Sequence, residues 1–449
     1  MGKLFGTDGI RGIANEYPMT AEMAINIGRA TAHLFKKKGH VAKIIVGKDT
    51  RISGYMFESA LVSGICSMGV NAIMVGVMPT PGIAFLTSSM RADAGIVISA
   101  SHNPLQDNGI KIFSSEGFKL PDDKEHVIEE FIFANASDKE HPAAGNLGKV
   151  YRLEDARGRY TVFLKHAFPK ECSLEGTKIV LDCANGATYR IAPETFFELG
   201  AEVTALFDKP DGVNINVGCG SQHPETIARE VVKRKAHAGF AFDGDGDRLI
   251  AVDEKGTVLT GDQILAICAR MMKKEGTLAN NLVVRTVMSN IGLGVALSEM
   301  GIDSVMTDVG DRKVLEEMRA RGAAIGGEDS GHLIFLDHHT TGDGIITALQ
   351  VLTAMKKEGK PLSELAKVMT VFPQMLINID VKSRPELDTV PEIVKAIKDA
   401  EAALGKKGRV LVRYSGTQNM CRVMVEGPTE KETERYCKQI AEVVKTKLA

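Results

Sequence analysis

The sequence contains no tryptophan, and aromatic residues make up only 5% of its 449 residues. Proteins that bind single-stranded nucleic acid usually stack the bases on aromatic side chains, so this composition argues against that class of protein. The formal net charge is only −2. A nearly neutral chain has no general attraction for nucleic acid or for an anionic membrane, so we expect neither as a partner. Any anionic ligand must therefore be held by local clusters of basic side chains.

Long apolar runs and paired cysteines are also missing. No stretch approaches the roughly 18 apolar residues that a membrane-spanning helix needs, and the first residues lack the apolar core of a secretory signal. The cysteines are seven in number and form no Cys-x-x-Cys pair, at positions 66, 172, 183, 219, 268, 421 and 437. We therefore expect free thiols and a cytoplasmic location. The P-loop, HExxH and GxSxG motifs are absent too, which argues against P-loop nucleotide enzymes, zinc proteases and α/β-hydrolases.

Length and internal repetition predict several domains of similar build. At roughly 100–200 residues per domain, three or four domains are expected. Residues 43–75, 178–206 and 281–306 share one order of features. Each segment begins with a strand rich in β-branched residues, passes through a polar or glycine-rich turn into a helix that ends at a glycine, and closes with a second strand. This βαβ order is typical of mainly parallel sheets with helices on their faces.

The last part of the chain has a different pattern. The expected order is strand, helix, two strands and helix, over residues 373–381, 391–404, 409–414, 421–426 and 430–448. This order predicts a small α+β domain. The predicted fold is therefore α/β, with three similar βαβ-type mixed-sheet domains followed by the α+β domain. The expected boundaries are 1–150, 151–253, 254–369 and 370–449.

A serine stands at the end of the apolar run Ala94–Ile98, in Ser99-Ala100-Ser101-His102-Asn103-Pro104. Ligands of open α/β sheets gather at the carboxyl ends of the strands. Ser101 can carry a phosphoryl group there if a base and a cation assist it. His102 is the adjacent candidate base, and Lys111 can stand near phosphate oxygens. The alternative is a tight polar loop with capping serines.

Three aspartates at alternate positions, Asp243, Asp245 and Asp247, follow the strand-like run 238–242. Carboxylates with glycines between them can converge on one hard cation, and Mg²⁺ prefers a few carboxylates together with phosphate oxygens or water. An EF-hand loop is a rival interpretation. It is disfavoured because Arg248 occupies the sixth position, where that loop needs glycine, and because the flanking segments read as strands. An acidic turn without a metal is the remaining alternative.

Three further loops carry groups that suit a sugar phosphate. In Gly327-Glu328-Asp329-Ser330-Gly331-His332, Glu328 and Ser330 can bond to sugar hydroxyls, although a plain hairpin turn has the same composition. In the run 413–419, arginine, hydroxyl and glycine residues form an anion-binding pattern, with Arg422 just beyond. Its alternative is a hairpin with surface arginines. The opening Phe-Gly-Thr-Asp-Gly-Ile-Arg-Gly places Arg11 in a glycine-rich turn, a weak signal when taken alone.

In this order, Ser-His-Asn-Pro, Asp-Gly-Asp-Gly-Asp-Arg, Gly-Glu-x-Ser-Gly-His and Arg-x-Ser-Gly-Thr resemble the motifs of the α-D-phosphohexomutases. The resemblance covers the whole chain, with one motif in each predicted domain. The opening motif and the length are similar to the bacterial phosphoglucosamine mutase branch of that family. The resemblance implies four domains around a central cleft and interconversion of glucosamine 6-phosphate and glucosamine 1-phosphate.

The resemblance also implies a role for each motif residue. Ser101 would be the phosphoserine, and its phosphate would hold one Mg²⁺ per chain together with Asp243, Asp245 and Asp247. The transfer site would be lined by Arg11, His102, Lys111 and Arg248. Sugar hydroxyls would be read by Glu328 and Ser330. The non-transferring phosphate would be gripped by Arg413, Ser415, Gly416, Thr417 and Arg422. A hexosamine 1,6-bisphosphate or glucose 1,6-bisphosphate would serve as activator, and the enzyme would be a monomer or homodimer.

The phosphate loop departs from the family pattern, in which Pro-Ser-Gly-Thr-Glu-Pro follows the arginine. This sequence has Tyr414, Gln418 and Asn419 at the positions of Pro, Glu and Pro. Losing two prolines and a carboxylate puts loop geometry and phosphate affinity in question, not the reaction class. Two other functions remain open from the sequence. One is a phosphomannomutase or phosphoglucomutase, and the other is a phosphosugar-binding protein without catalytic activity.

Overall fold

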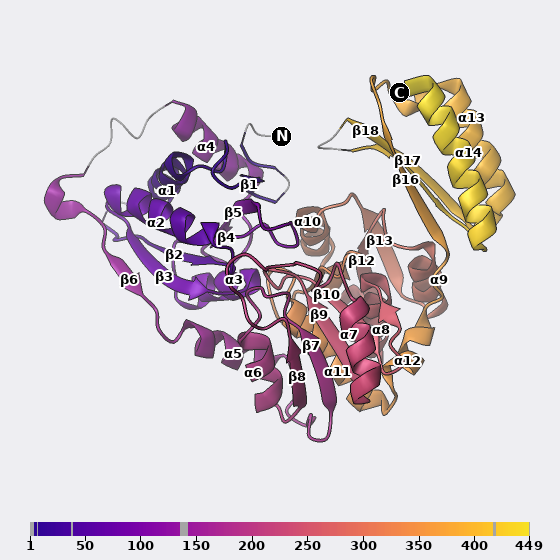
Figure 1. Ribbon diagram of the computed structural model, residues 1–449, viewed down its shortest axis with the longest axis horizontal. Coiled ribbons are helices and arrows are strands. Elements are labelled where there is room, and N and C mark those ends of the chain that lie inside the picture. Colours follow the sequence, from indigo (N-terminus) through magenta and orange to yellow (C-terminus); the bar gives the residue numbers. More distant parts are fainter. Residues whose placement is uncertain (1–3, 7, 37–38, 135–141, 416–418, 449) are drawn as a thin grey trace. The chain divides into compact units, whose positions relative to one another are not determined.

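The computed structural model describes residues 4–6, 8–36, 39–134, 142–415 and 419–448 (Figure 1). The chain forms two compact units, one of residues 1–287 and 303–367, the other of residues 288–302 and 368–449. The first unit holds three sheets and the second unit holds one. The domain boundaries expected near residues 150, 253 and 369, and the central cleft, stay predictions.

The first sheet has six strands in the order β1-β5-β4-β2-β3-β6. Its strands are β1 (Ile10–Ile13), β2 (Lys43–Lys48), β3 (Asn71–Val77), β4 (Ala94–Ile98), β5 (Asp107–Ser114) and β6 (Val150–Arg152). Its helices are α1 (Ala21–Phe35), α2 (Ser53–Ser67), α3 (Thr80–Ser89) and α4 (Asp122–Phe133). Strand β2 lies parallel to β3 and β4, and β5 lies antiparallel to β4 and β1.

Helices α1 and α2 of this sheet pack unusually closely. A Cβ atom on Gly28 would lie 2.5 Å from the Leu61 carbonyl oxygen, and one on Gly64 would lie 2.2 Å from the Ile25 carbonyl oxygen. Only glycine permits so close a backbone approach. The apolar faces of both helices join one core with the buried strands β2 and β4.

The second sheet has the order β11-β10-β9-β7-β8. Its strands are β7 (Lys178–Asp182), β8 (Glu202–Leu206), β9 (Ala238–Phe242), β10 (Leu249–Asp253) and β11 (Val258–Leu259), and its helices are α5 (Ala156–His166), α6 (Ile191–Glu198) and α7 (Glu225–Arg234). Strands β9 and β10 form an antiparallel hairpin. The turn of that hairpin is the acidic loop, at the carboxyl end of the buried strand β9.

The third sheet has the order β13-β12-β14-β15. Its strands are β12 (Leu282–Thr286), β13 (Asp303–Thr307), β14 (Ile325–Gly327) and β15 (Leu333–Phe335), and its helices are α8 (Gly261–Glu275), α10 (Asp311–Arg321), α11 (Gly344–Glu358) and α12 (Leu362–Leu365). The turn between β14 and β15 is the loop predicted to bind sugar. Helix α9 (Ile291–Glu299) follows β12 in the chain but belongs to the second unit.

The second unit contains an antiparallel sheet in the order β16-β18-β17. Its elements are β16 (Gln374–Asp380), α13 (Pro391–Leu404), β17 (Arg409–Tyr414), β18 (Met420–Glu426) and α14 (Glu430–Leu448). Helices α13 and α14 lie side by side over one face of the sheet, as Figure 1 shows. Alternate strand residues, among them Ile379 and Val423, form the core under these helices. The predicted order of strand, helix, two strands and helix is confirmed.

The three βαβ units predicted from the sequence are present. They are β2-α2-β3, β7-α6-β8 and β12-α9-β13, and each strand pair is parallel, although in the third the helix belongs to the second compact unit and the strands to the first. Each helix is followed by a glycine with positive φ, at Gly69 (80°), Gly200 (96°) and Gly301 (63°). All seven cysteines are free thiols. Within the described parts of the chain, no helix is both long and apolar enough to cross a membrane.

Candidate active site

The turn after β4 places Ser101 against the acidic loop of the second sheet. Strand β4 is buried throughout, and the chain leaves it through Ser99 into a tight turn in which Ser101 has φ +52°. The Ser101 hydroxyl donates a hydrogen bond to Asp243 Oδ2 at 2.5 Å. The first and second domains therefore meet at the predicted phosphoserine, and its side chain faces the predicted metal ligands.

The acidic loop gathers three buried carboxylates. One oxygen from each of Asp243, Asp245 and Asp247 lies within 4.8 Å of the others, and each residue is at most 4% exposed. Burial, and then repulsion from Asp247 and Asp245, raises the pKa of Asp243 well above its usual value. Asp245 Oδ1 and Asp247 Oδ1 have no hydrogen-bond partner among the described residues. An oxygen-only set with unpartnered buried atoms fits a hard divalent cation such as Mg²⁺.

Two residues of the first domain donate hydrogen bonds to one carboxylate oxygen of Asp245. Thr80, at the start of α3, donates its hydroxyl to Asp245 Oδ2 at 2.6 Å, and Lys111 Nζ donates to the same oxygen at 3.0 Å. The Lys111 side chain is 2% exposed and also lies 3.1 Å from Asp8 Oδ2 and 3.5 Å from Asp247 Oδ2. Burial alone would lower the pKa of Lys111, but Asp245, Asp8 and Asp247 raise it above its usual value. Lys111 is therefore a permanent cation beside the predicted transfer site.

Asp8 of the opening motif joins several of these cations. Its carboxylate forms ion pairs with Arg11, Lys111 and Lys119. Burial works to raise the pKa of Asp8, but Lys111, Lys119 and Arg11 together hold it well below its usual value. Lys119 also pairs with Asp311, at the start of α10. The sequence pattern gave Asp8 only as part of the opening motif and pointed to no role for Lys119 or Asp311.

His102 and Arg248 complete the surroundings of the Ser101 hydroxyl. His102 Nδ1 lies 3.3 Å from Ser101 Oγ. Burial, with further repulsion from Arg248 and Arg11, lowers the pKa of His102 to about 4. Burial alone would lower the pKa of Arg248, but Asp247, Asp243 and Glu328 raise it. At neutral pH the site therefore holds an uncharged imidazole, able to accept a proton, beside a charged guanidinium.

The predicted sugar loop lies next to the acidic loop. The Leu249 backbone N–H, where the acidic hairpin re-enters β10, donates to the Gly331 carbonyl oxygen at 3.0 Å. A Cβ on Gly331, where φ is +89°, would lie 2.1 Å from the Leu249 carbonyl oxygen. The Ser330 hydroxyl is buried without a hydrogen-bond partner among the described residues. Glu328 Oε1 accepts from the Gly310 N–H at 3.0 Å. The structure thus brings together the loops that were predicted to hold metal and sugar.

His332 connects the sugar loop to the acidic loop. Its ring nitrogens lie 3.7 Å from Asp247 Oδ1 and 3.7 Å from Asp311 Oδ2. Burial works to lower the pKa of His332, but Asp247 and then Asp311 raise it above its usual value. The imidazole is 3% exposed. A change in the structure of the sugar loop can therefore affect Asp247, a predicted metal ligand, through the His332 side chain.

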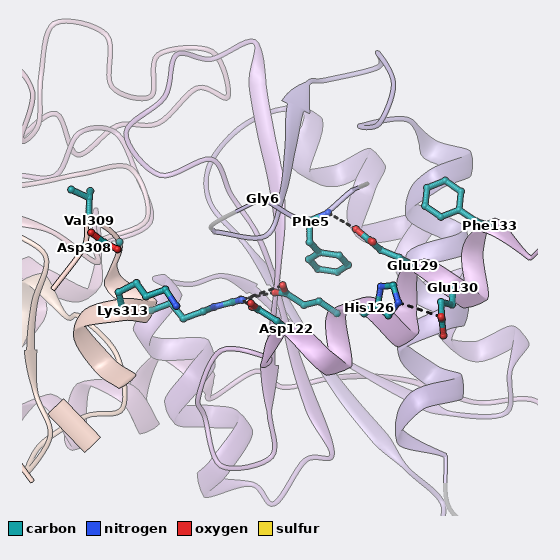
Figure 2. Close-up of a pocket in the computed structure, with 13 residues that line it drawn as sticks. Phe5, Gly6, Asp122, His126, Glu129, Glu130, Phe133, Asp308, Val309 and Lys313 are labelled. Atoms are coloured by element: carbon teal, nitrogen blue, oxygen red, sulfur yellow. Dashed lines mark hydrogen bonds and ion pairs between the residues drawn. The ribbon is translucent and has the colours of Figure 1, made fainter. Parts of the chain in front are cut away.

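A cavity of about 890 Å³ lies between the opening segment, helix α4 and the start of α10 (Figure 2). Its walls are the segment Phe5–Gly6, helix α4 and residues 308–313 at the start of α10. Figure 2 shows the Phe5 backbone N–H donating to Glu129 of α4, a bond of 2.9 Å. Neither Ser101 nor the three aspartates line this cavity. It reaches the predicted site only at Gly310, whose N–H bonds to Glu328.

The predicted phosphate loop belongs to the second unit. Arg413 of β17 and Arg422 of β18 are directly opposite in the antiparallel register, so their side chains project from the same face of the sheet. Like charges directly opposite each other in a sheet are destabilising. Ser415 is buried, and its N–H donates to the Met420 carbonyl oxygen at 2.9 Å. The predicted ligands Gly416 and Thr417 lie outside the described residues, as does Gln418.

Tyr414, which replaces a proline of the family pattern, anchors the base of this loop. Its hydroxyl donates to the Pro385 carbonyl oxygen at 2.8 Å, and the Arg384 guanidinium lies 5.7 Å from the centre of its ring. These contacts fix the Tyr414 side chain at the end of β17.

Family models match four successive parts of the chain. They are described as phosphoglucomutase/phosphomannomutase, with alpha/beta/alpha domain I over residues 2–139, domain II over 159–256, domain III over 260–372 and the C-terminal domain over 376–443. Each of the four sequence motifs discussed above falls in a different matched range, in the predicted order.

Individual proteins and structures agree with these models. A phosphoglucosamine mutase of Syntrophus aciditrophicus (strain SB) is 75% identical over 448 residues, covering 100% of both chains. A phosphoglucomutase/phosphomannomutase family protein from Burkholderia thailandensis has the same fold, with a TM-score of 0.80 at 24% identity over 98% of this chain and 97% of that one. The Aspergillus fumigatus N-acetylphosphoglucosamine mutase, solved with GlcNAc-6P and magnesium, has a TM-score of 0.71 at 17% identity over 99% and 95%. The chain therefore belongs to the phosphoglucosamine mutases of the phosphoglucomutase/phosphomannomutase family, and the resemblance inferred from its motifs is confirmed.

Proposed function

We propose that the chain interconverts glucosamine 6-phosphate and glucosamine 1-phosphate through a phosphoserine at Ser101. The observation that carries this proposal is the 2.5 Å hydrogen bond from the Ser101 hydroxyl to Asp243, beside the buried carboxylates of Asp245 and Asp247 and the buried ammonium of Lys111. A hydrolase would release the phosphate to water, whereas a mutase must return it to the same serine. The proposal adds a substrate and a chemical route to the family membership established above.

The metal site would consist of Asp243, Asp245 and Asp247. Thr80 and Lys111 occupy Asp245 Oδ2, which leaves the unpartnered Oδ1 to face a cation. Bound Mg²⁺ would neutralise charge on the transferring phosphoryl group, where most catalysis of phosphoryl transfer arises. The Aspergillus fumigatus structure, solved with magnesium, supports this choice of ion.

The protein's own cations supply the rest of the charge compensation. Lys111 is held at the transfer site by Asp245 and Asp8, and Arg11 is held by Asp8. A sugar hydroxyl would attack the phosphorus of phosphoserine, so that a new O–P bond forms while the Ser101 Oγ–P bond breaks. His102 Nδ1, at 3.3 Å from Ser101 Oγ and uncharged at neutral pH, would accept the proton that the attacking sugar hydroxyl loses and pass it to Ser101 Oγ as that oxygen leaves the phosphorus.

The bisphosphorylated sugar formed in this way must turn around before the second transfer. Glu328 and Ser330 would bind hydroxyls of the ring in both orientations, and the unpartnered Ser330 hydroxyl is available for this. Arg413, Ser415, Gly416, Thr417 and Arg422 would grip the phosphate that is not being transferred. Two arginines on one sheet face recognise a phosphate dianion whichever sugar carbon carries it.

Replacing Arg413 by alanine should weaken substrate binding far more than folding. We expect KM for glucosamine 6-phosphate to rise roughly 10- to 100-fold, the range for one charged hydrogen-bonding group. The melting temperature should stay close to that of the wild type, because the side chain projects from the face opposite α13 and α14. Lys431→Ala, on the exposed side of α14, is the matched control. An unchanged KM in Arg413→Ala would reject the phosphate-grip role.

The decisive test of the proposal is a coupled assay started with glucose 1,6-bisphosphate. The kcat/KM values for glucosamine, glucose and mannose 6-phosphates should be compared in the same buffer. We expect the amino sugar to be preferred. A preference for glucose or mannose phosphate would redirect the proposal to a phosphoglucomutase or phosphomannomutase, and no turnover of any of them would favour a phosphosugar-binding protein.

Three other expectations belong to this proposal. A hexosamine 1,6-bisphosphate or glucose 1,6-bisphosphate would place the first phosphate on Ser101, because the unmodified serine has nothing to donate. A cytoplasmic location is supported by the seven free thiols. Whether the enzyme is a monomer or a homodimer stays a prediction.

A further inference from the structure

The backbone of Ser101 is held in an unfavourable conformation. Its φ of +52° lies in the left-handed region, which residues with a Cβ atom rarely adopt. Such a conformation persists only where the surroundings impose it. In this conformation the hydroxyl donates to Asp243 Oδ2 at 2.5 Å. The contacts that impose the shape are therefore part of the site.

Arg51 is the first of these contacts. Its side chain is 0% exposed, and all five N–H groups of its guanidinium are used. One of its nitrogens donates to the carbonyl oxygens of Ser101 at 3.2 Å and Asn103 at 2.8 Å. The other terminal nitrogen donates to the carbonyl oxygens of Pro104 and Asp107. A single buried side chain thus fixes four carbonyl groups of the turn.

The Ser101 N–H is held, through Ser99, by the same pair of residues, Asp49 and Arg51. Asp49 Oδ2 accepts from Arg51 Nε at 2.9 Å and from the Ser99 hydroxyl at 2.6 Å. The Ser99 oxygen in turn accepts from the Ser101 N–H at 3.0 Å. Both the N–H and the C=O of Ser101 are therefore tied to the Asp49–Arg51 pair, directly or through Ser99.

A residue of the second domain binds the same carbonyl groups. The Asn216 side-chain amide donates to the Ser101 carbonyl oxygen at 2.9 Å and to the Asn103 carbonyl oxygen at 3.1 Å. Asn216 itself has φ +59° and is anchored by its N–H to the Ala184 carbonyl oxygen at 2.9 Å. A Cβ on Gly244 of the acidic loop would lie 2.6 Å from the Ser101 carbonyl oxygen. The domain that carries the acidic loop thus also grips the serine turn.

We infer that Arg51 and Asn216 are positioning residues that fix the left-handed turn of Ser101. Arg51 acts from the domain that contains the turn, and Asn216 acts from the second domain. Asn216 makes the serine geometry depend on contact between the first two domains. The expected effect of these residues on catalysis rests on the proposed function. The restraint on the turn does not depend on any substrate. Neither residue touches the reacting atoms.

Asn216→Gly is the cleanest test, because glycine tolerates the positive φ while the amide donors are removed. Asn216→Asp keeps the size of the side chain but presents carboxylate oxygens to two carbonyl oxygens. Asn214→Ala is the matched control, since its amide bonds only within the same loop, to residues 209 and 211. For both Asn216 variants we expect kcat to fall roughly 10- to 100-fold with KM unchanged, because misplacing a reacting group by about 1 Å has this effect. Asn214→Ala should keep the wild-type kcat.

Hydrogen–deuterium exchange of residues 99–104 supplies a readout that needs no substrate. Faster exchange in Asn216→Gly, with wild-type exchange in Asn214→Ala, supports the inference. Wild-type exchange and wild-type kcat in Asn216→Gly would overturn it, as would an equal loss of kcat in the Asn214→Ala control. If the wild type itself takes up no phosphate on Ser101 and shows no turnover, the proposed function fails, and the exchange result alone decides the inference.

Discussion

Ser101→Ala should lose mutase turnover by a factor on the order of 10⁴ or more, the scale of removing a catalytic nucleophile. The loss follows because no other hydroxyl donates to Asp243 within the described residues, so the phosphoryl group has no alternative carrier. Binding of glucosamine 6-phosphate should persist, because the predicted phosphate grip lies in another domain. Coupled-assay rates and isothermal titration with the sugar phosphate measure the two effects separately.

Intact-mass measurement identifies the cause of this loss. After incubation with glucose 1,6-bisphosphate, the wild type should contain a fraction heavier by one phosphoryl group, and Ser101→Ala should contain none. Ser115→Ala, an exposed serine on the loop after β5, should keep both the phosphorylated fraction and the activity. Turnover near the wild-type rate in Ser101→Ala would eliminate the phosphoserine mechanism.

Lys111→Met should have the second largest effect, on activity and on stability together. The variant leaves the buried Asp245 and Asp247, and the partly buried Asp8, without the cation that they share. Breaking a buried ion pair by removing one partner costs about 3–5 kcal/mol. We expect kcat to fall roughly 10²- to 10³-fold, the scale of removing one group that stabilises transition-state charge.

The stability change should depend on the metal. In EDTA the melting temperature of Lys111→Met should fall clearly below that of the wild type, and millimolar Mg²⁺ should restore part of the difference, because a cation bound by the aspartates compensates the same charge. Lys124→Met, exposed on α4, is the control and should match the wild type in both buffers. A variant with wild-type stability in EDTA would show that Lys111 is not the counter-ion of this cluster.

Local patterns in the sequence predicted the scaffold and the main loops. The β-branched runs, the turns that follow them and the glycines after the helices located three parallel βαβ units, which the structure contains. Ser101 and Asp243 each follow a buried strand, and the rule that ligands gather at the carboxyl ends of strands was enough to predict that both belong to a site. Their contact does not follow from this rule, because the strands belong to different sheets, and only the family resemblance implied it.

The residues that support the site escaped prediction for the same reason. Thr80 follows a proline at a helix start, and nothing in that pattern distinguishes it from an ordinary first turn. A buried Arg51 or Lys119 side chain contradicts the usual exposure of charged side chains. Most partners of Arg51 lie 50 or more residues away, and Asp311 lies 192 residues from Lys119. Asn216 sits in a loop whose composition predicts a turn. Long-range pairing, not local composition, gives these residues their roles.

The two arginines that face each other across β17 and β18 have a practical consequence for anyone handling this enzyme. Sulfate and inorganic phosphate are tetrahedral dianions of the same size and charge as the group these side chains are expected to grip. Purification in phosphate buffer, or precipitation with ammonium sulfate, would leave a competitor in place. Apparent Michaelis constants measured afterwards would then be raised by competition from the buffer anion. Dialysis into a chloride or acetate buffer should therefore precede every kinetic comparison.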